Sequence, residues 1–224
     1  MTKWLDKLIQ LIFPYKCTFC SKTISKDKYI CTNCITRILS KYVGKTRKLK
    51  GTCDRILYVT GYKEIKNYML KYKFNHAKYL SKVFAALLIQ RLVENKIQPD
   101  YITFVPISKE RLKERGYNQV ESIANIIADF FNKESLNIIV KSVDNKVQSS
   151  LNKQERTSNV IDIFEINKKL DITKIQNKKI LLLDDVFTTG ATLKECVRTI
   201  KKSAKCNIDI AVVALNNIKL IEVK

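Results

Sequence analysis

Two adjacent carboxylates and a group of small hydroxylated residues follow a short apolar run in the last quarter of the chain. Residues 180–183 are all apolar, which is typical of a strand buried on both faces of a parallel sheet. Asp184 and Asp185 stand where this strand is expected to end, and segment 188–192 then leads into a helical pattern. Free N–H groups at a helix start bind phosphate, whereas carboxylates suit ribose hydroxyls or Mg²⁺. The pattern predicts a site for a ligand with ribose and phosphate; the alternative is an ordinary turn with two solvated aspartates.

A second polar turn follows the strand expected at residues 101–105. Pro106 comes directly after this strand, and Arg111 and Arg115 lie in the basic segment before the next helix. Guanidinium groups match phosphate oxygens, so both arginines are candidates for contacts to a diphosphate or to nucleic acid. The alternative is that they are solvent-exposed helix charges. In a doubly wound sheet, ligands bind at the carboxyl ends of the strands, so this turn is expected near the acidic pair.

Four of the seven cysteines have the spacing of metal ligands. Two CxxC pairs are separated by ten residues, which matches a tetrahedral structural Zn²⁺ site with no open ligand position. The alternative is a set of reduced, buried thiols. The predicted zinc ligands are Cys17, Cys20, Cys31 and Cys34, whereas Cys53, Cys196 and Cys206 are interpreted as packing residues.

Composition narrows the class of protein. The chain has 224 residues, 46% of them apolar, which is enough for one well-buried α/β domain and a small appendage. No apolar run approaches the roughly 18 residues that a membrane span needs, so we expect none. An odd cysteine number without a recognisable secretory signal indicates a reducing, cytoplasmic location.

Positive charge is abundant and concentrated near the start of the sequence. The chain holds 42 Lys and Arg against 21 Asp and Glu, a net charge of +21. This suits a polyanion such as nucleic acid, although a lysine-rich composition that only maintains solubility explains it equally well. Segment 41–50 is either a nucleic-acid contact or a solvated linker, and a domain boundary is expected near residue 51, between modules 1–50 and 51–224. The nucleic-acid candidates are Lys45, Arg47, Lys48, Lys50 and Arg111.

Hydrophobic periodicity predicts the remaining elements. An amphipathic helix is expected at residues 3–13, and helical spacing covers 65–93 with a break near 75–76. The helix after residue 119 is expected to bury Val120, Ile123, Ile126, Ile127 and Phe130. Strands are expected at 55–60, 101–105, 136–142, 180–183 and 209–215, and a helix at 193–204. The polar segment 144–160 is long for a connection and is interpreted as a candidate lid.

These motifs together resemble the ComF family of phosphoribosyltransferase-like proteins of bacterial DNA uptake. Segment 180–192 is similar to the PRPP-binding motif of type I phosphoribosyltransferases. The CxxC pairs, Lys73-Phe74, Val105-Pro106 and the run from Arg115 to Gln119 resemble further family blocks, as do Gln148, Leu151, Arg156 and Asn159. The chain departs from the family after Lys73-Phe74, where Asn75-His76-Ala77 replaces the usual Gly-Asp pair.

The resemblance implies a fold, ligands and roles. The fold would be α/β, a type I phosphoribosyltransferase-like parallel sheet flanked by helices, with an N-terminal zinc-ribbon module. Its ligands would be structural Zn²⁺, PRPP with Mg²⁺, and single-stranded DNA, and other DNA-uptake proteins are candidate partners. Catalytic roles would fall to Asp184, Asp185 and Arg156, and PRPP contacts to these aspartates, Val186, Thr188, Thr189, Gly190, Ala191, Thr192, Pro106 and Arg115.

Two functions are compatible with this resemblance. The first is a competence protein that binds single-stranded DNA and PRPP on a phosphoribosyltransferase-like scaffold. The alternative is an active phosphoribosyltransferase that transfers the phosphoribosyl group from PRPP to a base or an amine. The sequence identifies no acceptor pocket, and a fold alone does not decide between them.

Overall fold

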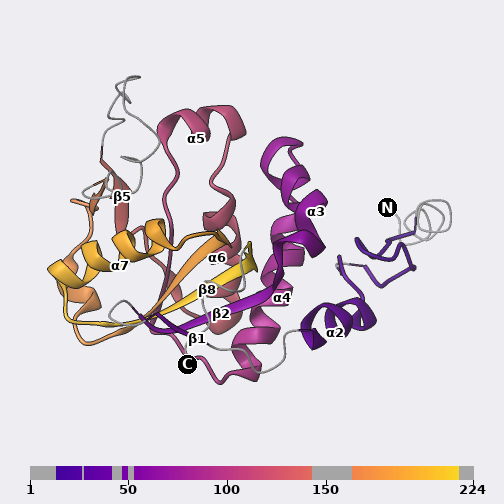
Figure 1. Cartoon of the computed structure of the whole chain (residues 1–224), viewed down its shortest axis with the longest axis horizontal. Coiled ribbons are helices and arrows are strands. Elements are labelled where there is room, and N and C mark those ends of the chain that lie inside the picture. Colours follow the sequence, from indigo (N-terminus) through magenta and orange to yellow (C-terminus); the bar gives the residue numbers. More distant parts are fainter. Residues whose placement is uncertain (1–13, 27, 42–46, 50–52, 143–162, 217–224) are drawn as a thin grey trace, which may run out of the picture.

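The computed structural model describes residues 14–26, 28–41, 47–49, 53–142 and 163–216 (Figure 1). Its helices are α2 (Thr32–Ser40), α3 (Tyr62–Phe74), α4 (Leu80–Glu94), α5 (Lys109–Arg115), α6 (Gln119–Phe131) and α7 (Ala191–Ser203), with the 3₁₀ turn η2 (Ile172–Ile175). Its strands are β1 (Arg47–Leu49), β2 (Cys53–Gly61), β3 (Tyr101–Phe104), β4 (Glu134–Ser135), β5 (Ile139–Lys141), β6 (Phe164–Ile166), β7 (Lys179–Phe187) and β8 (Asn207–Leu215).

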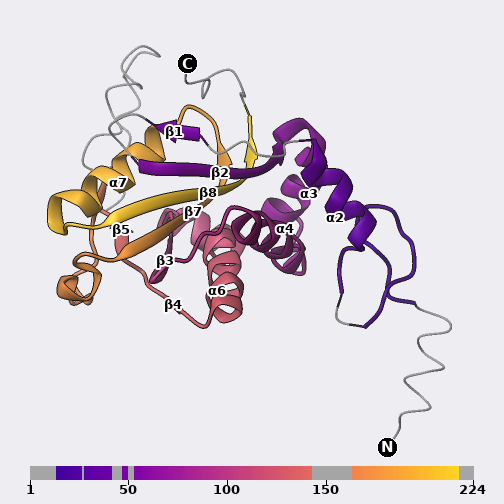
Figure 2. The same ribbon diagram turned by 90° about the horizontal axis from the view of Figure 1, so that it is seen from below.

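Six of these strands form one sheet in the order β1-β2-β8-β7-β3-β4, which Figure 2 shows from top to bottom. All neighbouring pairs are parallel except β1 and β2 at one edge. Strands β5 and β6 pair antiparallel in a separate two-stranded sheet. The chain therefore has the expected α/β fold with a parallel sheet flanked by helices.

Side chains of the central strands alternate between two cores. Leu181 and Leu183 of β7 face the core that contains α3, α4 and α6, whereas Ile180 and Leu182 face the core that contains α7. A strand with both faces covered has no polar side, which explains why its sequence is a continuous apolar run. The sheet thus forms the middle of three layers.

The module that holds the four clustered cysteines packs directly on α3 and α4. Cys34, Ile38 and Leu39 belong to the same buried core as α4, and the rings of Phe19 and Tyr68 lie 4.5 Å apart. The buried Arg91 of α4 donates to the Leu39 carbonyl at 3.0 Å. Figure 1 shows α2 and the preceding loops beside α3 and α4 at one end of the molecule.

Most element predictions are confirmed, and three need correction. The predicted break between two helices is confirmed at residues 75–79, between α3 and α4. Segment 136–142 is not one strand, because residues 139–141 leave the main sheet to pair with β6. Phe130 is 57% exposed rather than buried, because the buried stripe of α6 runs through Ala124 and Ala128. The expected helix at 3–13 lies outside the described residues.

The third correction concerns the acidic pair. Asp184 and Asp185 lie inside β7, which continues to Phe187, and Asp184 and Val186 remain in register with β8. The strand is therefore longer than its apolar run, and the pair does not follow its end.

Candidate functional site

The site lies at the carboxyl edge of the sheet, between β3 and β7. The chain leaves β3 through α5 and α6 and returns at β4 on one side, whereas it leaves β7 through α7 and returns at β8 on the other. The strand order therefore reverses between these two neighbours, which is where open α/β sheets bind ligands. The Val105 N–H donates to the Leu183 carbonyl at 3.0 Å, so Pro106 and the acidic pair emerge side by side.

The two carboxylates of the pair lie on opposite faces of the sheet. Successive strand residues alternate, so Asp184 follows Leu182 toward the α7 core and Asp185 follows Leu183 toward the α3 core. Their surroundings agree with this assignment. Burial and then the charge of Asp184 raise the pKa of the Cys196 thiol in α7, whereas Asp185 pairs with a lysine of α3.

That lysine is Lys73, in the last turn of α3. Its Nζ lies 2.6 Å from Asp185 Oδ2, and the two side chains are only 22% and 14% exposed. An ion pair in such a partly buried position is stronger than a surface pair, because water screens it less. In the sequence, Lys73 stands out only as part of a family block, and no role is predicted for it.

Asp184 has a different electrostatic environment. Burial first, and then the charge of Asp185, raise the pKa of Asp184 well above the usual range, which the Lys73 ammonium only partly offsets. Its Oδ1 accepts a hydrogen bond from the Asp185 N–H at 2.8 Å. The pair thus combines one carboxyl that favours its proton, Asp184, with one that lies in an ion pair with Lys73.

The turn after β7 brings the backbone of α7 to the sheet edge. Gly190 has φ +79°, and a Cβ at this position would lie 2.5 Å from Cζ of Phe187. Only glycine therefore fits between the strand end and α7. Thr188 and Thr189 are exposed on this turn, and Thr189 Oγ1 accepts from the Ala191 N–H at 3.4 Å. Ala191 begins α7, and the N–H groups of the first turn of a helix are donors that suit phosphate.

The block from Arg115 to Gln119 fixes the opposite wall. Asn118 donates to the Val105 carbonyl at 3.2 Å and accepts from the Val120 N–H, so one side chain joins the end of β3 to the start of α6. A tyrosine hydroxyl joins this block to α3, since the Tyr117 O–H donates to the Tyr72 carbonyl at 2.7 Å. Most of these residues position the site rather than face a ligand.

Aromatic rings and cations pair with one another around residues 74–82, next to Lys73, and we call this group the aromatic-basic surface: Tyr29, Phe74, Lys78, Tyr79, Lys82, Arg115 and Tyr117. Phe74 follows Lys73 directly, is 54% exposed and lies under the Arg115 guanidinium at 5.3 Å. Tyr79 is 46% exposed and stacks on Tyr29 at a centroid distance of 6.2 Å. Two further cations lie over rings: Lys78 over Tyr117 and Lys82 over Tyr29, each at 5.1 Å.

The four predicted cysteine ligands come together. Their sulfur atoms all lie within 4.8 Å of one another, and those of Cys20 and Cys31 are 3.7 Å apart. Tetrahedral zinc with bonds of about 2.3 Å places sulfurs roughly 3.8 Å apart, so the cluster can hold this ion. Burial opposes ionisation of Cys17, but backbone N–H donors, including Cys31 at 3.4 Å, lower its pKa to about 6. Such donors favour the thiolate that a metal needs.

The other predicted site residues are placed as follows. Arg111 is exposed on α5, and its backbone N–H donates to Ser108 Oγ at 3.3 Å. The backbone of Arg47 and Lys48 lies in β1 at the sheet edge. Arg156, Lys45 and Lys50 lie outside the described residues, as does the candidate lid at 144–160. The structure thus brings Pro106 beside Asp184 and Asp185, with segment 188–192 directly after β7, whereas the Arg115 guanidinium contacts Gln119 and the Phe74 ring.

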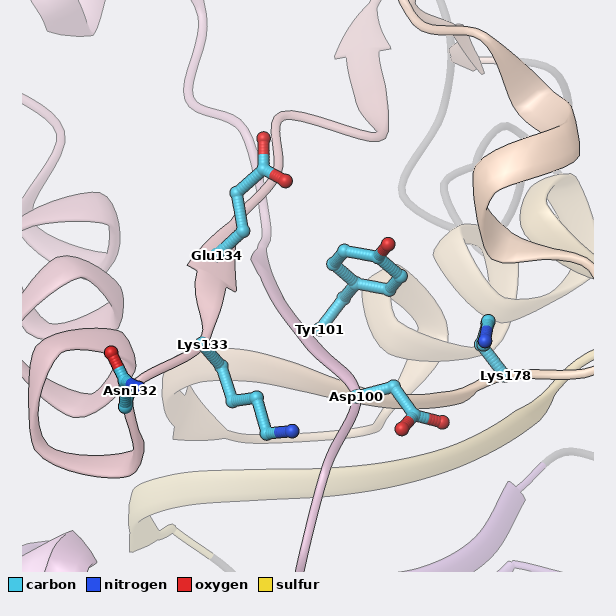
Figure 3. Close-up of a pocket in the computed structure, with 6 residues that line it drawn as sticks. All are labelled: Asp100, Tyr101, Asn132, Lys133, Glu134 and Lys178. Atoms are coloured by element: carbon cyan, nitrogen blue, oxygen red, sulfur yellow. The ribbon is translucent and has the colours of Figure 1, made fainter.

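An open cavity of about 540 Å³ lies at the opposite edge of the sheet, where β3, β4 and β7 begin (Figure 3). Asp100 and Lys178 line it, and Asp100 already accepts a hydrogen bond from the Lys179 backbone at 2.9 Å. A smaller cavity of about 220 Å³ lies beside Pro106, Leu112 and Asn118. The larger cavity lies at the opposite edge from the acidic pair, and the smaller one is below the roughly 300–1,000 Å³ of ordinary small-molecule sites, so neither is an evident acceptor pocket.

No helix of the described residues has both the length and the apolar character that crossing a bilayer requires.

A parallel sheet with a strand–turn–helix site at its switch point is shared by several ligand-binding α/β classes, and the sequence identifies which of them this chain belongs to. A model of the phosphoribosyl transferase domain family matches residues 83–224. Among solved structures, the purine phosphoribosyltransferase of Pyrococcus horikoshii aligns with 18% identity over 61% of this chain and 74% of that chain, at a TM-score of 0.40.

Several curated relatives carry competence names. Competence protein ComFC of Streptococcus pneumoniae is 30% identical over 192 residues, which is 84% of this chain and 81% of that protein. Competence protein F of Haemophilus influenzae is 26% identical over 83% of this chain and 84% of its own length. The chain belongs to the ComF family.

Proposed function

We propose that the chain is a cytoplasmic DNA-uptake protein that binds a phosphoribosyl ligand, PRPP with Mg²⁺, and single-stranded DNA at adjoining sites. The observation that carries this proposal is the position of residues 73 and 74 at the end of α3. Lys73 contacts Asp185 of the β7 site at 2.6 Å, and the next residue, Phe74, belongs to the aromatic-basic surface. A nucleic acid on this surface and a phosphoribosyl group at β7 would therefore be neighbours.

The β7 site supports phosphoribosyl binding through complementary chemistry. The turn at 188–190 and the first turn of α7 supply N–H and hydroxyl donors for a 5′-phosphate. The carboxyl groups of Asp184 and Asp185 suit ribose hydroxyls. Pro106 lies beside them at the end of β3, where the backbone and Arg115 can contact a diphosphate, and Mg²⁺ would bridge its oxygens.

The aromatic-basic surface supports binding of single-stranded nucleic acid. Stacking on aromatic rings suits any base, and cations beside the rings attract the phosphate backbone. Phe74 and Tyr79 expose about half of their surface, and Lys78, Lys82 and Arg115 lie beside rings of this surface. The zinc module contributes Tyr29, so a structural zinc at the four cysteines would hold one side of the surface in place.

The DNA part is tested by comparing Phe74→Ala with Phe130→Ala. Both rings are similarly exposed, at 54% and 57%, but Phe130 lies on α6 away from the surface. We expect Phe74→Ala to weaken binding of a single-stranded oligonucleotide by about 5- to 100-fold, as loss of one stacked base does, in fluorescence anisotropy at fixed salt. Phe130→Ala should bind as the unchanged protein does, and equal affinities for both variants would refute this surface.

The ligand part is tested by calorimetry with PRPP and Mg²⁺. Thr188→Ala with Thr189→Ala should lose about tenfold or more in affinity, since each removes a donor to phosphate. Thr36→Ala on α2 is the control, because it is exposed and remote from β7. No heat with the unchanged protein would refute the phosphoribosyl site.

Diphosphate release decides the alternative of an active phosphoribosyltransferase. The protein would be incubated with PRPP, Mg²⁺ and a panel of bases and amines. Diphosphate release that depends on one defined acceptor would show that the protein is an active phosphoribosyltransferase and not a binding scaffold. Binding of PRPP without acceptor-dependent release is the outcome we expect.

A further inference from the structure

An enclosed ion pair joins α3 to the acidic pair. Lys73 lies 112 residues before Asp185 in the sequence, yet its ammonium reaches the Asp185 carboxylate at 2.6 Å. Both side chains are largely enclosed, at 22% and 14% exposure. Its neighbours Lys71 and Phe74 on the same helix are exposed. Lys73 is therefore enclosed, whereas Lys71, the other cation of this turn, faces solvent.

The contact is not explained as a source of stability. An enclosed ion pair loses hydration on both partners, and a pair of apolar residues is often as stable in such a place. The pair occurs at the carboxyl edge of the sheet, beside Pro106 and the turn of Gly190. Its location therefore indicates a role in binding a ligand at this edge of the sheet.

We propose that Lys73 is a positioning residue that acts as a built-in counter-cation. It holds the Asp185 carboxylate and occupies the position that a divalent cation would otherwise take at this carboxylate. The free protein therefore does not bind Mg²⁺ at Asp185, and the metal arrives together with the diphosphate of the ligand. The statement about the ligand rests on the proposed function, whereas the statement about the free protein does not.

Charge balance supports this role. The Asp185 carboxylate, at the carboxyl edge of the sheet, would repel a ligand that carries both a phosphate and a diphosphate. The Lys73 ammonium neutralises Asp185, which leaves the donors of the 188–190 turn and Arg115 to dominate the potential at the edge. Its position at the C-terminal end of α3 is also favourable for a cation, because the helix dipole is negative there.

The first experiment measures Mn²⁺ binding to the zinc-loaded full chain by electron paramagnetic resonance, without nucleotide. The variants are Lys73→Met, Lys73→Arg and the matched control Lys71→Met. We expect Lys73→Met to bind Mn²⁺ at least about tenfold more tightly than the other three proteins, and Asp185→Asn in the same chain to abolish the gain. Equal Mn²⁺ binding by Lys73→Met and the unchanged protein would overturn the proposal.

The second experiment titrates PRPP by calorimetry at low and high Mg²⁺. We expect Lys73→Met to lose about tenfold in affinity at low Mg²⁺ and to recover as Mg²⁺ rises, whereas Lys73→Arg stays near the unchanged protein. A variant that has merely lost its fold would not recover with Mg²⁺.

The two experiments separate this inference from the proposed function. If the unchanged protein binds PRPP and Lys73→Met binds it equally at every Mg²⁺ concentration, the counter-cation role fails and the function stands. If PRPP does not bind but Lys73→Met alone gains Mn²⁺, the function fails and the inference about the free protein stands.

Discussion

Among single residues, Asp184 has the clearest consequence for stability. Burial and the neighbouring charge of Asp185 raise its pKa in the folded protein above that of the unfolded chain. The folded state then binds more protons than the unfolded state above the unfolded pKa, so the free energy of unfolding falls as pH rises toward the folded pKa. Stability from this group is present in acid and lost toward neutral and alkaline pH.

Asp184→Asn is expected to remove this decrease in the free energy of unfolding with rising pH, because the amide resembles the protonated acid. Between about pH 5 and 8 the variant should gain roughly 1 kcal/mol or more relative to the unchanged protein, measured by urea unfolding at each pH. Asp171→Asn is the control. Hydrogen bonds from Thr173 lower the pKa of Asp171, so that variant should leave the fall in this range intact. Parallel curves for Asp184→Asn and the unchanged protein would contradict this account.

Gly190 and Gly116 form a matched pair for a second prediction. Both have positive φ, +79° and +74°, but only Gly190 has a ring within 4 Å of the Cβ position. Gly116→Ala should cost about 1 kcal/mol for the backbone alone, and Gly190→Ala about 2–4 kcal/mol because Phe187 must also move. Chemical denaturation of both variants measures the difference. Equal losses would show that the Phe187 ring adapts without cost.

At the scale of elements, the cysteine module is expected to stabilise α4 and not only itself. Ile38 and Leu39 of α2 share a buried core with α4, and Arg91 of α4 is tied to the Leu39 carbonyl. Removal of metal by a chelator should therefore increase hydrogen exchange in residues 80–94 and lower the Tm by about 5 °C or more. Exchange in α6 serves as an internal comparison. Unchanged protection of α4 would mean that the module folds independently.

The elements were predictable where one local pattern decided them. The continuous apolar run of β7 and the stripe of α7 led to the right structures, because both are buried on the faces that their periodicity indicates. The end of β7 was not predictable. Carboxylates usually terminate a buried strand, but here Lys73 compensates one of them and burial favours the proton on the other. The outward position of Phe130 was missed because two alanines of α6 fill the helix–sheet contact.

The site was predictable in part for the same reason. The turn of Gly190 and the cysteine pairs are local motifs, and the cysteine sulfurs do come together. The contact of Lys73 with Asp185 depends on how α3 lies over the sheet, and no local spacing encodes that. The aromatic-basic surface likewise combines residues of the cysteine module, α3, α4 and α5 that are distant in sequence.

For the whole molecule, the strand order has a consequence for how the protein is made. β8 is the last described strand, yet it lies in the middle of the sheet and pairs with β2 on one side and β7 on the other. During synthesis, about 150 further residues must therefore be added before β8 can pair with β2, and until then that edge of β2 is unpaired. We expect the nascent chain to depend on chaperones until residue 215 has left the ribosome, and chains that stop before residue 207 to aggregate through the exposed edges of β2 and β7. A release assay with arrested chains of increasing length would find protease resistance appearing in one step, after β8 and not before.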